Sequence, residues 1–518
     1  MEINNEIKYQ RVVNCPDTYA ESQTDYILPD YMADMRKILF TDATLRQSGR
    51  FAGGDGVEFS GVVVYNLIYL DSEGELSSVE FTSDYDYLVK CSGEDYDDSL
   101  ASTRVSNYAI RLIGPRKISA RASLVSSVSL FEEKSLAVSG NSFATEKPEV
   151  NRASIKVKNC RASSVVEREY AEMVCRLDGA IADELSVLYP TVEVMPDEVK
   201  AEGDGVDIKG KIKMSALIKN GEEDIYSVEK LVPFEESVEL DAAEGFDHLV
   251  PQLSVCSVKA SVNPDENGCE VVISCIIELC AVGEGNRQID PILDAYLKQA
   301  PTENGYEDFR YTTYIDSVVT RGSHNAELSR SDTDSENMSS VIFLTATPKV
   351  ERVERDGGSV TVFGEVRYSG VATENQEDKH SYVGVKFSSP FEVNVNINYQ
   401  NTDNLQVETD VQAYNCTAYL DQDKLHATCT LESTVTVSEE KSCRILASMS
   451  HKEGEKYESD ASLITVYYPT DGDTLFSVAK RFHTSGLKLA KDNDISELVF
   501  ASDNPSGTLG GVKKLIIY

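Results

Sequence analysis

One sequence pattern occurs three times in the chain and constrains its fold more than any other feature. The three copies are VEFSGVVVYNLIY at 57–69, VDIKGKIKMSALI at 206–218 and VTVFGEVRYSGVA at 360–372. In each copy apolar residues alternate around a central glycine, which is the periodicity of a half-buried β-strand. The glycines are separated by 149 and 154 residues (210 − 61 and 364 − 210), a period too long for a solenoid repeat and suited to tandem domains.

The sequence around the three glycines repeats as well. Glu80 and Glu229 each stand 19 positions after their glycine, in SVEF and SVEK. VPFEESVEL at 232–240 matches SPFEVNVNI at 389–397. Each copy then ends in a long alternating hairpin, and the turns of these hairpins contain Gly-Pro, Asn-Pro-Asp-Glu-Asn-Gly and Asp-Gln-Asp, which favour tight turns. We therefore expect three copies of one β domain.

The domain boundaries follow from the polar stretches between the copies. We predict β domains at residues 1–138, 150–284 and 300–440, and a small helical domain at 462–518. The predicted linkers are 139–151, 283–291 and 450–462. The charged, serine-rich segment 324–340 is predicted to be a mobile loop within the third copy. The predicted fold is thus mainly β, with three tandem β-rich repeat domains followed by a small βααβ domain.

Charge and hydropathy exclude some function classes. With 49 basic and 87 acidic residues the chain carries a net charge of −38, which repels phosphate backbones and anionic lipid headgroups. Nucleic-acid binding is therefore not expected, although the acidic excess is equally explained as a means of keeping a large β protein in solution. No stretch approaches the roughly 20 apolar residues of a membrane-spanning helix, and VVISCIIELC at 271–280 is predicted to be a strand. The N-terminus lacks the pattern of a secretory signal, so we expect a cytoplasmic protein.

Eleven cysteines are scattered through the chain without CxxC pairs. In a chain that shows no export signal, this pattern favours reduced thiols over disulfides. Five cysteines lie in strand-like sequence and are predicted to be small apolar core residues, with a transient disulfide as the alternative. These five are Cys269, Cys275, Cys280, Cys416 and Cys429.

The segment 462–518, called the C-terminal module below, has a different pattern from the rest of the chain. LITVYY at 463–468 alternates as a short strand, DGD at 471–473 is a turn, and KKLIIY at 513–518 returns as a strand. Between them Asp473 or Thr474 is predicted to cap one helix, and Thr484 or Ser485 a second. The first helix has an apolar stripe and the second carries three apolar residues: Leu475, Val478, Ala479 and Phe482, then Leu487, Leu489 and Ala490.

Two family resemblances follow from these residues. The triplicated pattern resembles the spore-coat (SPOCS) domain of spore-coat morphogenesis proteins from endospore-forming bacteria. The order β-α-α-β and the stretch GDTLFSVAKRF at 472–482 are similar to the LysM family. In that family N-acetylglucosamine chains lie between the loop after the first strand and the loop after the second helix. The resemblance implies ligand or partner binding by Gly472, Asp473, Thr474, Leu475, Phe476, Asn493, Asp494 and Ile495.

The C-terminal module departs from the LysM pattern in two places. Phe476 stands where the family often has tryptophan, and the stretch 500–511 before the last strand is longer than usual. In spore-coat relatives the equivalent module docks proteins, so the resemblance implies a coat morphogenetic ATPase of the SpoIVA type as partner. It also implies a location in the mother cell, at the forespore surface. The module contains six basic and six acidic residues, so the net charge of −38 lies outside it.

No catalytic constellation is visible in the sequence. The histidines have no second histidine or cysteine at close zinc-ligand spacing, and no GxSxG elbow, phosphate loop or strand-linked GxGxxG is present. The stretch DQDK at 421–424 lacks the glycine and distal glutamate of a calcium loop. No cofactor or metal is expected, and an enzyme has no residue-level support. We expect a non-enzymatic scaffold that docks a coat protein; the alternative is a protein that binds peptidoglycan or another N-acetylglucosamine glycan.

Overall fold

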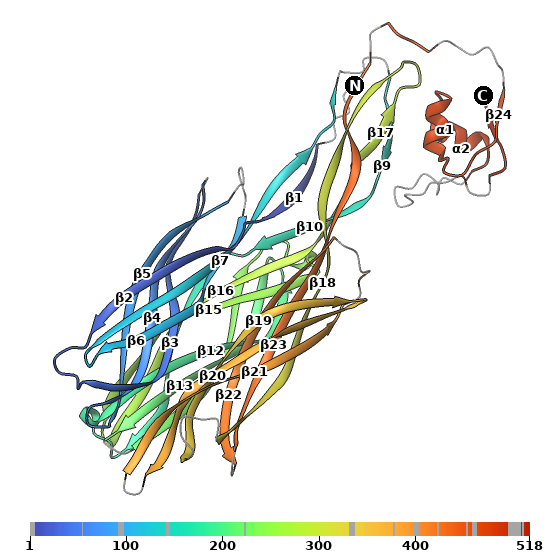
Figure 1. Cartoon of the computed structure of the whole chain (residues 1–518). Coiled ribbons are helices and arrows are strands. Elements are labelled where there is room, and N and C mark those ends of the chain that lie inside the picture. Colours follow the sequence, from blue (N-terminus) through green and yellow to red (C-terminus); the bar gives the residue numbers. More distant parts are fainter. Residues whose placement is uncertain are drawn as a thin grey trace.

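The computed structural model consists mainly of antiparallel strands, with two short α-helices near the C-terminus (Figure 1). The structure describes residues 6–518 except 54, 92–97, 141–145, 222–223, 331–336, 377–378, 398, 400–403, 422–423, 452–453, 458–463, 496–508 and 510–511. The strands form an elongated body, and the helices lie in a small cluster beside one end of it (Figure 1). The prediction of a mainly β fold is confirmed.

The first unit of the body is made of seven strands in two sheets. They are β1 (Ile7–Asn14), β2 (Thr18–Ile27), β3 (Met35–Gly53), β4 (Gly56–Asp71), β5 (Leu76–Lys90), β6 (Asp98–Gly114) and β7 (Lys117–Leu136). In one sheet β7 pairs with both β1 and β2 along one edge and with β6 along the other. The other sheet has the order β3-β4-β5.

The second unit has the same order of strands. They are β10 (Ile155–Ala162), β11 (Val166–Asp178), β12 (Leu185–Glu202), β13 (Gly205–Asn220), β14 (Asp224–Glu239), β15 (His248–Asp265) and β16 (Gly268–Ile289). Here β16 pairs with β10 and β11 along one edge and with β15 along the other, and β12-β13-β14 form the second sheet. Two short 3-10 helices, Ala182–Glu184 and Ala243–Gly245, connect strands of this unit.

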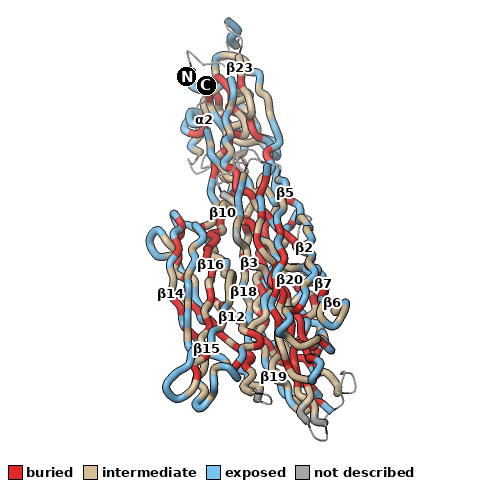
Figure 2. The backbone as a smooth tube through the Cα atoms, turned by 90° about the vertical axis from the view of Figure 1, so that its left-hand side faces the viewer, coloured by how far each residue is buried: buried red, intermediate tan, exposed pale blue. Residues whose placement is uncertain are grey.

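In the third unit one long strand takes the place of the first two. The strands are β18 (Glu303–Ser329), β19 (Met338–Asp356), β20 (Ser359–Gln376), β21 (Lys379–Asn396), β22 (Leu405–Asp421) and β23 (Lys424–Ser450). β18 and β22 flank β23 in one sheet, and β19-β20-β21 form the other. In each unit the main core lies between the two sheets, because alternate residues of the strands turn toward the facing sheet. Figure 2 shows this as buried stretches running through the interior of the body.

The three repeated glycines occupy the central strands β4, β13 and β20 of the three-stranded sheets. A Cβ atom on Gly210 would lie against the carbonyl oxygen of Met195 on β12 and 2.7 Å from the ring of Phe234 on β14. The other two glycines have equivalent neighbours: Gly61 meets Arg46 and Tyr85, and Gly364 meets Lys349 and Phe391. Glycine is therefore required by the close approach of a neighbouring strand and an aromatic ring.

An aromatic residue from each unit meets the other two at one junction. Phe40, Tyr189 and Phe343 are separated by 149 and 154 residues (189 − 40 and 343 − 189), the same spacing as the glycines. The ring centroids lie 4.9 Å apart for Phe40–Tyr189, 4.9 Å for Phe40–Phe343 and 5.7 Å for Tyr189–Phe343. Each ring follows a register shift in β3, β12 or β19. The three units therefore pack directly on one another around a shared core, which we call the aromatic junction.

Polar contacts also join the units. The Tyr189 hydroxyl donates to Asp42 Oδ2 at 2.8 Å, and Lys219 Nζ lies 2.8 Å from Glu75 Oε2. The Gln10 side chain accepts from the backbone N–H of Cys160 at 2.6 Å and donates to its carbonyl at 2.7 Å. This pair of bonds holds the Gln10 side chain against β10, because it engages both the N–H and the carbonyl of Cys160.

Three predictions about connecting segments need correction. The predicted linker 283–291 is wrong, because β16 continues to Ile289 and pairs there with β10. The predicted loop 324–340 is wrong at both ends, because β18 continues to Ser329 and β19 begins at Met338. Residues 331–336 lie outside the described part. The predicted linker 139–151 begins and ends in the short strands β8 (Ser139–Gly140) and β9 (Glu149–Arg152). These polar sequences form strands because their backbones pair with strands that are distant in the sequence, which local composition does not reveal.

The prediction of reduced thiols is wrong for one pair of cysteines. Cys15, after β1, and Cys91, after β5, form a disulfide with a Cα–Cα distance of 5.6 Å across a sequence separation of 76. It links the two sheets of the first unit, and only the closing of these sheets on each other brings the two residues together. Of the five cysteines predicted to lie in cores, four are buried and Cys416 is partly buried.

The C-terminal module follows the body at the end that carries β9 and β17 (Ile292–Tyr296), which pair as a two-stranded sheet. The module contains β24 (Thr465–Tyr467), α1 (Leu475–Arg481), α2 (Gly486–Asp492) and β25 (Leu515–Ile517). β24 and β25 pair in antiparallel register. The predicted two strands and two helices are present in the predicted order. None of the helices in the described part of the chain is long and apolar enough to cross a membrane.

Candidate functional site

The first candidate loop of the module ends in a helix cap. The Thr474 hydroxyl accepts from the N–H of Ser477 at 3.0 Å, and the Ser477 hydroxyl accepts from the N–H of Thr474 at 2.9 Å. This reciprocal capping box satisfies two N–H groups at the start of α1 and decides between the two predicted caps in favour of Thr474. Leu475 is buried in the module core with Val478 and Ala479. Thr474 therefore caps α1, and Leu475 belongs to the core of the module.

Asp473 holds the turn that precedes this cap. Its Oδ2 atom accepts from the Thr470 N–H at 2.7 Å, the Tyr467 hydroxyl at 2.8 Å and the Thr470 hydroxyl at 3.0 Å. The bond from the Thr470 backbone, followed by that from Tyr467, lowers the pKa of Asp473 below its usual value. Gly472 has a φ angle of 93°, which favours glycine at this point of the turn. The acidic turn is therefore built mainly by its own hydrogen bonds.

The second candidate loop ties α2 to β25. The Asn493 side chain donates to the carbonyls of Leu489 at 2.9 Å and Ile516 at 2.8 Å, and it accepts from the Ile516 N–H at 2.6 Å. Asp494 is exposed and adopts a left-handed φ of 52°, a conformation that Asp tolerates better than most residues. Ile495 packs partly against the module core. Of this loop only Asp494 presents its side chain largely to solvent.

Leu475 and Ile495 bring the two loops to a common core, but no hydrogen bond joins the described residues of one loop to those of the other. Leu509, a described residue of the long stretch 500–511, is buried in this core, and its N–H donates to the Asp473 carbonyl at 3.0 Å. The rest of that stretch, apart from Leu509, lies outside the described residues. Leu509 therefore occupies space beside the first loop, where the resemblance to the LysM family places a ligand.

Phe476 does not project freely into solvent. Its ring lies 5.2 Å, centroid to centroid, from that of Tyr296 on β17, in an edge-to-face arrangement. Tyr296 is 2% exposed, and its hydroxyl donates to the Thr484 carbonyl at 2.7 Å. Burial raises the pKa of Tyr296, so the hydroxyl remains a donor at neutral pH. Phe476, one of the predicted binding residues, is thus used in an intramolecular contact.

A salt bridge strengthens the contact between the module and β17. Lys480 Nζ on α1 lies 2.5 Å from Asp294 Oδ2, while Asp294 Oδ1 accepts from the Tyr306 hydroxyl at 2.8 Å and from the Asn304 side chain at 3.0 Å. The ring of His483 stacks on Tyr457, with centroids 3.4 Å apart. Asp294, Tyr296 and Tyr457 could not be predicted from the sequence, because they lie outside the module and carry no motif.

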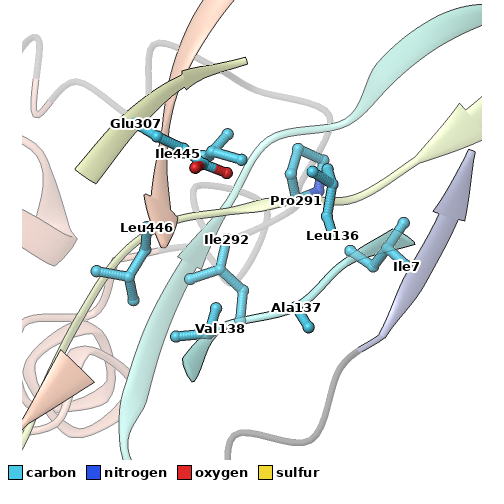
Figure 3. A pocket seen from close by; sticks show the side chains of 9 residues that line it. All are labelled: Ile7, Leu136, Ala137, Val138, Pro291, Ile292, Glu307, Ile445 and Leu446. Atoms are coloured by element: carbon cyan, nitrogen blue, oxygen red, sulfur yellow. The ribbon is translucent and has the colours of Figure 1, made fainter. Parts of the chain in front are cut away.

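The described residues offer no alternative site of metal-binding character. In the described ranges no three His, Cys, Asp or Glu side chains are grouped so that they could hold a metal ion. A cavity of about 20 Å³ lies between β1, β7, β17, β18 and β23 (Figure 3). It is lined chiefly by apolar side chains, among them Ile7, Leu136, Val138, Ile292, Ile445 and Leu446. This volume fits about one water molecule, so the cavity is not a ligand site.

A larger hollow of about 430 Å³ lies open to solvent between β14 and β19. Its lining includes Tyr226, Val341, Thr373 and Tyr382, without a convergent set of charged groups. It adjoins the aromatic junction and lies at the outer edge of the contact between the second and third units. Comparison with known protein families, with curated proteins and with solved structures found no match for this chain.

Proposed function

We propose that the chain is a non-enzymatic scaffold of spore-coat assembly, with three SPOCS-like repeats and a LysM-like module that docks a coat morphogenetic ATPase of the SpoIVA type. In the order of its parts the chain resembles the spore-coat protein SipL and is similar in plan to SpoVID. The three two-sheet units correspond to the repeats. The C-terminal module, with its strand, two helices and strand, corresponds to the LysM-like part.

The observation that carries the proposal is the aromatic junction. Phe40, Tyr189 and Phe343 recur at the same spacing as the glycines and pack their rings together. Three equivalent units packed on one core make a rigid body, whereas units on mobile linkers would not hold their surfaces in a fixed arrangement. A rigid body that ends in one small, charge-balanced module suits a protein whose task is to position a partner.

The environment of the candidate loops favours a protein partner over a glycan. Asp473, Thr474 and Asn493 make hydrogen bonds within the module, and Phe476 packs on Tyr296. These groups are the ones that a sugar would need for polar contacts and stacking. Leu509 further fills space beside the first loop. The glycan alternative uses the same loops and is tested in the same experiment.

The test measures binding of a purified SpoIVA-type ATPase to the immobilised full-length chain. Leu475→Asp places a charge in the core of the module and should disrupt it, because Leu475 is buried. Leu231→Asp is the matched control, because Leu231 is 53% exposed on β14 of the body. We expect ATPase binding to the wild type and to the Leu231 variant, and at least a tenfold loss for the Leu475 variant. Equal binding by all three chains would place the contact outside the module and refute the assignment.

A further inference from the structure

The two strands of the C-terminal module have an inward and an outward face. Tyr467, Leu515 and Ile517 turn toward the helices and belong to the module core. Because side chains alternate along a strand, the residues between them turn to the other side of the sheet. The register pairs Val466 with Ile516, so outward side chains of the two strands stand next to each other. The outward positions are Ile464, Val466, Tyr468, Lys514, Ile516 and Tyr518, which we call the outer face.

The outer face is apolar and exposed. Tyr468 is 67% exposed, Tyr518 60%, Ile464 57% and Val466 50%. In a small two-layer domain the sheet face that does not carry the helices ordinarily meets water and is polar. Five apolar residues among six outward positions are therefore unusual for a sheet face that meets only water. A contiguous patch of this kind marks an interaction surface.

The charged residue among the outward positions is a lysine. Lys514 occupies an outward position, and Lys513 precedes it in the chain. Lys488 on α2 reaches the end of β25, where its Nζ donates to the Tyr518 carbonyl at 3.3 Å. None of the outward positions carries an acidic residue. Lysines therefore flank the patch at both ends of β25, in a chain whose net charge is −38.

In the described part of the chain, the contacts between the module and the body do not involve the outer face. The helices lie between β17 and β24 (Figure 1). α1 is held to β17 through Lys480 and Asp294 and through Phe476 and Tyr296. The contact with the body therefore uses the helical side of the module, and the outer face lies on the side remote from the helices.

We propose that the outer face docks a peptide segment of a partner protein in which apolar and acidic residues alternate. The inference rests on the proposed docking function and names the surface that performs it. A face only two strands wide suits a peptide better than a broad folded surface. Acidic side chains complement the lysines, and apolar ones cover Val466 and its neighbours. A second copy of this chain would bring the same lysines and another −38 body into contact, which charge repulsion opposes.

The test uses a defined probe, a fluorescent eight-residue peptide of alternating Glu and Val, with an alternating Lys and Val peptide as its charge-reversed control. Fluorescence anisotropy measures binding to the full-length chain. Val466→Lys introduces a charge on the outer face, and Val319→Lys is the matched control on β18, where Val319 is 43% exposed. We expect the acidic peptide to bind the wild type and the Val319 variant equally, and the Val466 variant at least tenfold more weakly.

Several outcomes would overturn the inference. These are no binding of the acidic peptide, equal binding of the basic peptide, no effect of Val466→Lys, and binding by the outer face only to anionic phosphatidylglycerol vesicles or to a second copy of the chain. The ATPase assay separates this inference from the proposed function. If the ATPase binds the wild type and the Val466 variant alike, the docking function stands and the outer face is excluded. If the acidic peptide binds the outer face while the ATPase does not bind the chain, the proposed partner is wrong and the surface assignment stands.

Discussion

Replacing Gly210 with alanine tests why a glycine recurs in the central strand of each unit. Gly210 lies on β13, where the added methyl group would meet the Met195 carbonyl and the Phe234 ring from the two neighbouring strands. Both neighbours belong to paired strands of the same sheet. Neither can move away without a shift of the sheet, so we expect the variant to be strained.

The magnitude follows from two opposing effects. An extra methyl group in a filled space costs about 1–3 kcal/mol. Alanine recovers about 0.5–1 kcal/mol, because glycine loses more conformational entropy on folding. Since the nearest atoms are a backbone carbonyl oxygen and an aromatic ring held in paired strands, the cost lies at the upper end of its range, about 2–3 kcal/mol, and the net destabilisation is about 1–2.5 kcal/mol. For a unit of roughly 150 residues each kcal/mol lowers Tm by about 2–4 °C, so the expected decrease is about 2–10 °C.

Differential scanning calorimetry of the full-length chain measures this decrease. Gly322→Ala is the matched control, because Gly322 also lies in a strand, β18, and has no atom within 4 Å of an added Cβ. We expect the control to be unchanged or slightly stabilised. Gly61→Ala and Gly364→Ala should resemble Gly210→Ala, since the same types of atoms surround all three. A Gly210 variant as stable as the Gly322 variant would refute the steric explanation of the repeated glycine.

Three further predictions concern single contacts. Burial raises the pKa of Asp42, so folding favours its protonated form. The stability of the wild type therefore falls as the pH rises from about 4 through the raised pKa. Asp42→Asn removes this dependence. The Tm advantage of that variant over the wild type should therefore be larger at pH 7.5 than at pH 4.5 in thermal scans, and a constant difference would contradict this. Replacing Cys15 and Cys91 together with serine opens a loop closed across 76 residues and should lower the free energy of unfolding by about 4 kcal/mol in non-reducing urea titrations. Cys443→Ser, at a free and partly buried cysteine, should have a much smaller effect, and equal losses would argue against a stabilising disulfide. Thr474→Ala removes the cap of α1 and should destabilise the module by about 1 kcal/mol, which hydrogen exchange detects as faster exchange of the α1 amides. Thr474→Ser should retain the cap and the slower exchange. Equal exchange rates in the two variants would show that the cap is dispensable.

Strand content and many strand positions were predictable from the sequence, because they depend on local alternation. Val57 and Phe59 on β4 are buried and Glu58 is exposed, as the period of two predicts. The helices of the module were predictable for a similar reason, since the stripe of Leu475, Val478 and Ala479 is buried. Leu487, by contrast, is 61% exposed on α2 although it is apolar.

What was not predictable depends on contacts between distant parts of the chain. The aromatic junction joins Phe40, Tyr189 and Phe343, and nothing in the local sequence of each indicates that the rings meet. The Cys15–Cys91 disulfide likewise depends on how two sheets close. For the candidate site, the motif predicted the turn and the cap but not the contact of Phe476 with Tyr296, which comes from outside the module.

The most direct test of the account is isothermal titration calorimetry of the full-length chain with two ligands, a SpoIVA-type ATPase and an N-acetylglucosamine hexamer. The account predicts saturable binding of the ATPase and no heat of binding from the hexamer, because the polar groups of the candidate loops are engaged within the module. The Val466→Lys variant should bind the ATPase at least tenfold more weakly, with Val319→Lys unchanged. Saturable binding of the hexamer without binding of the ATPase would contradict the account and make the chain a glycan-binding protein.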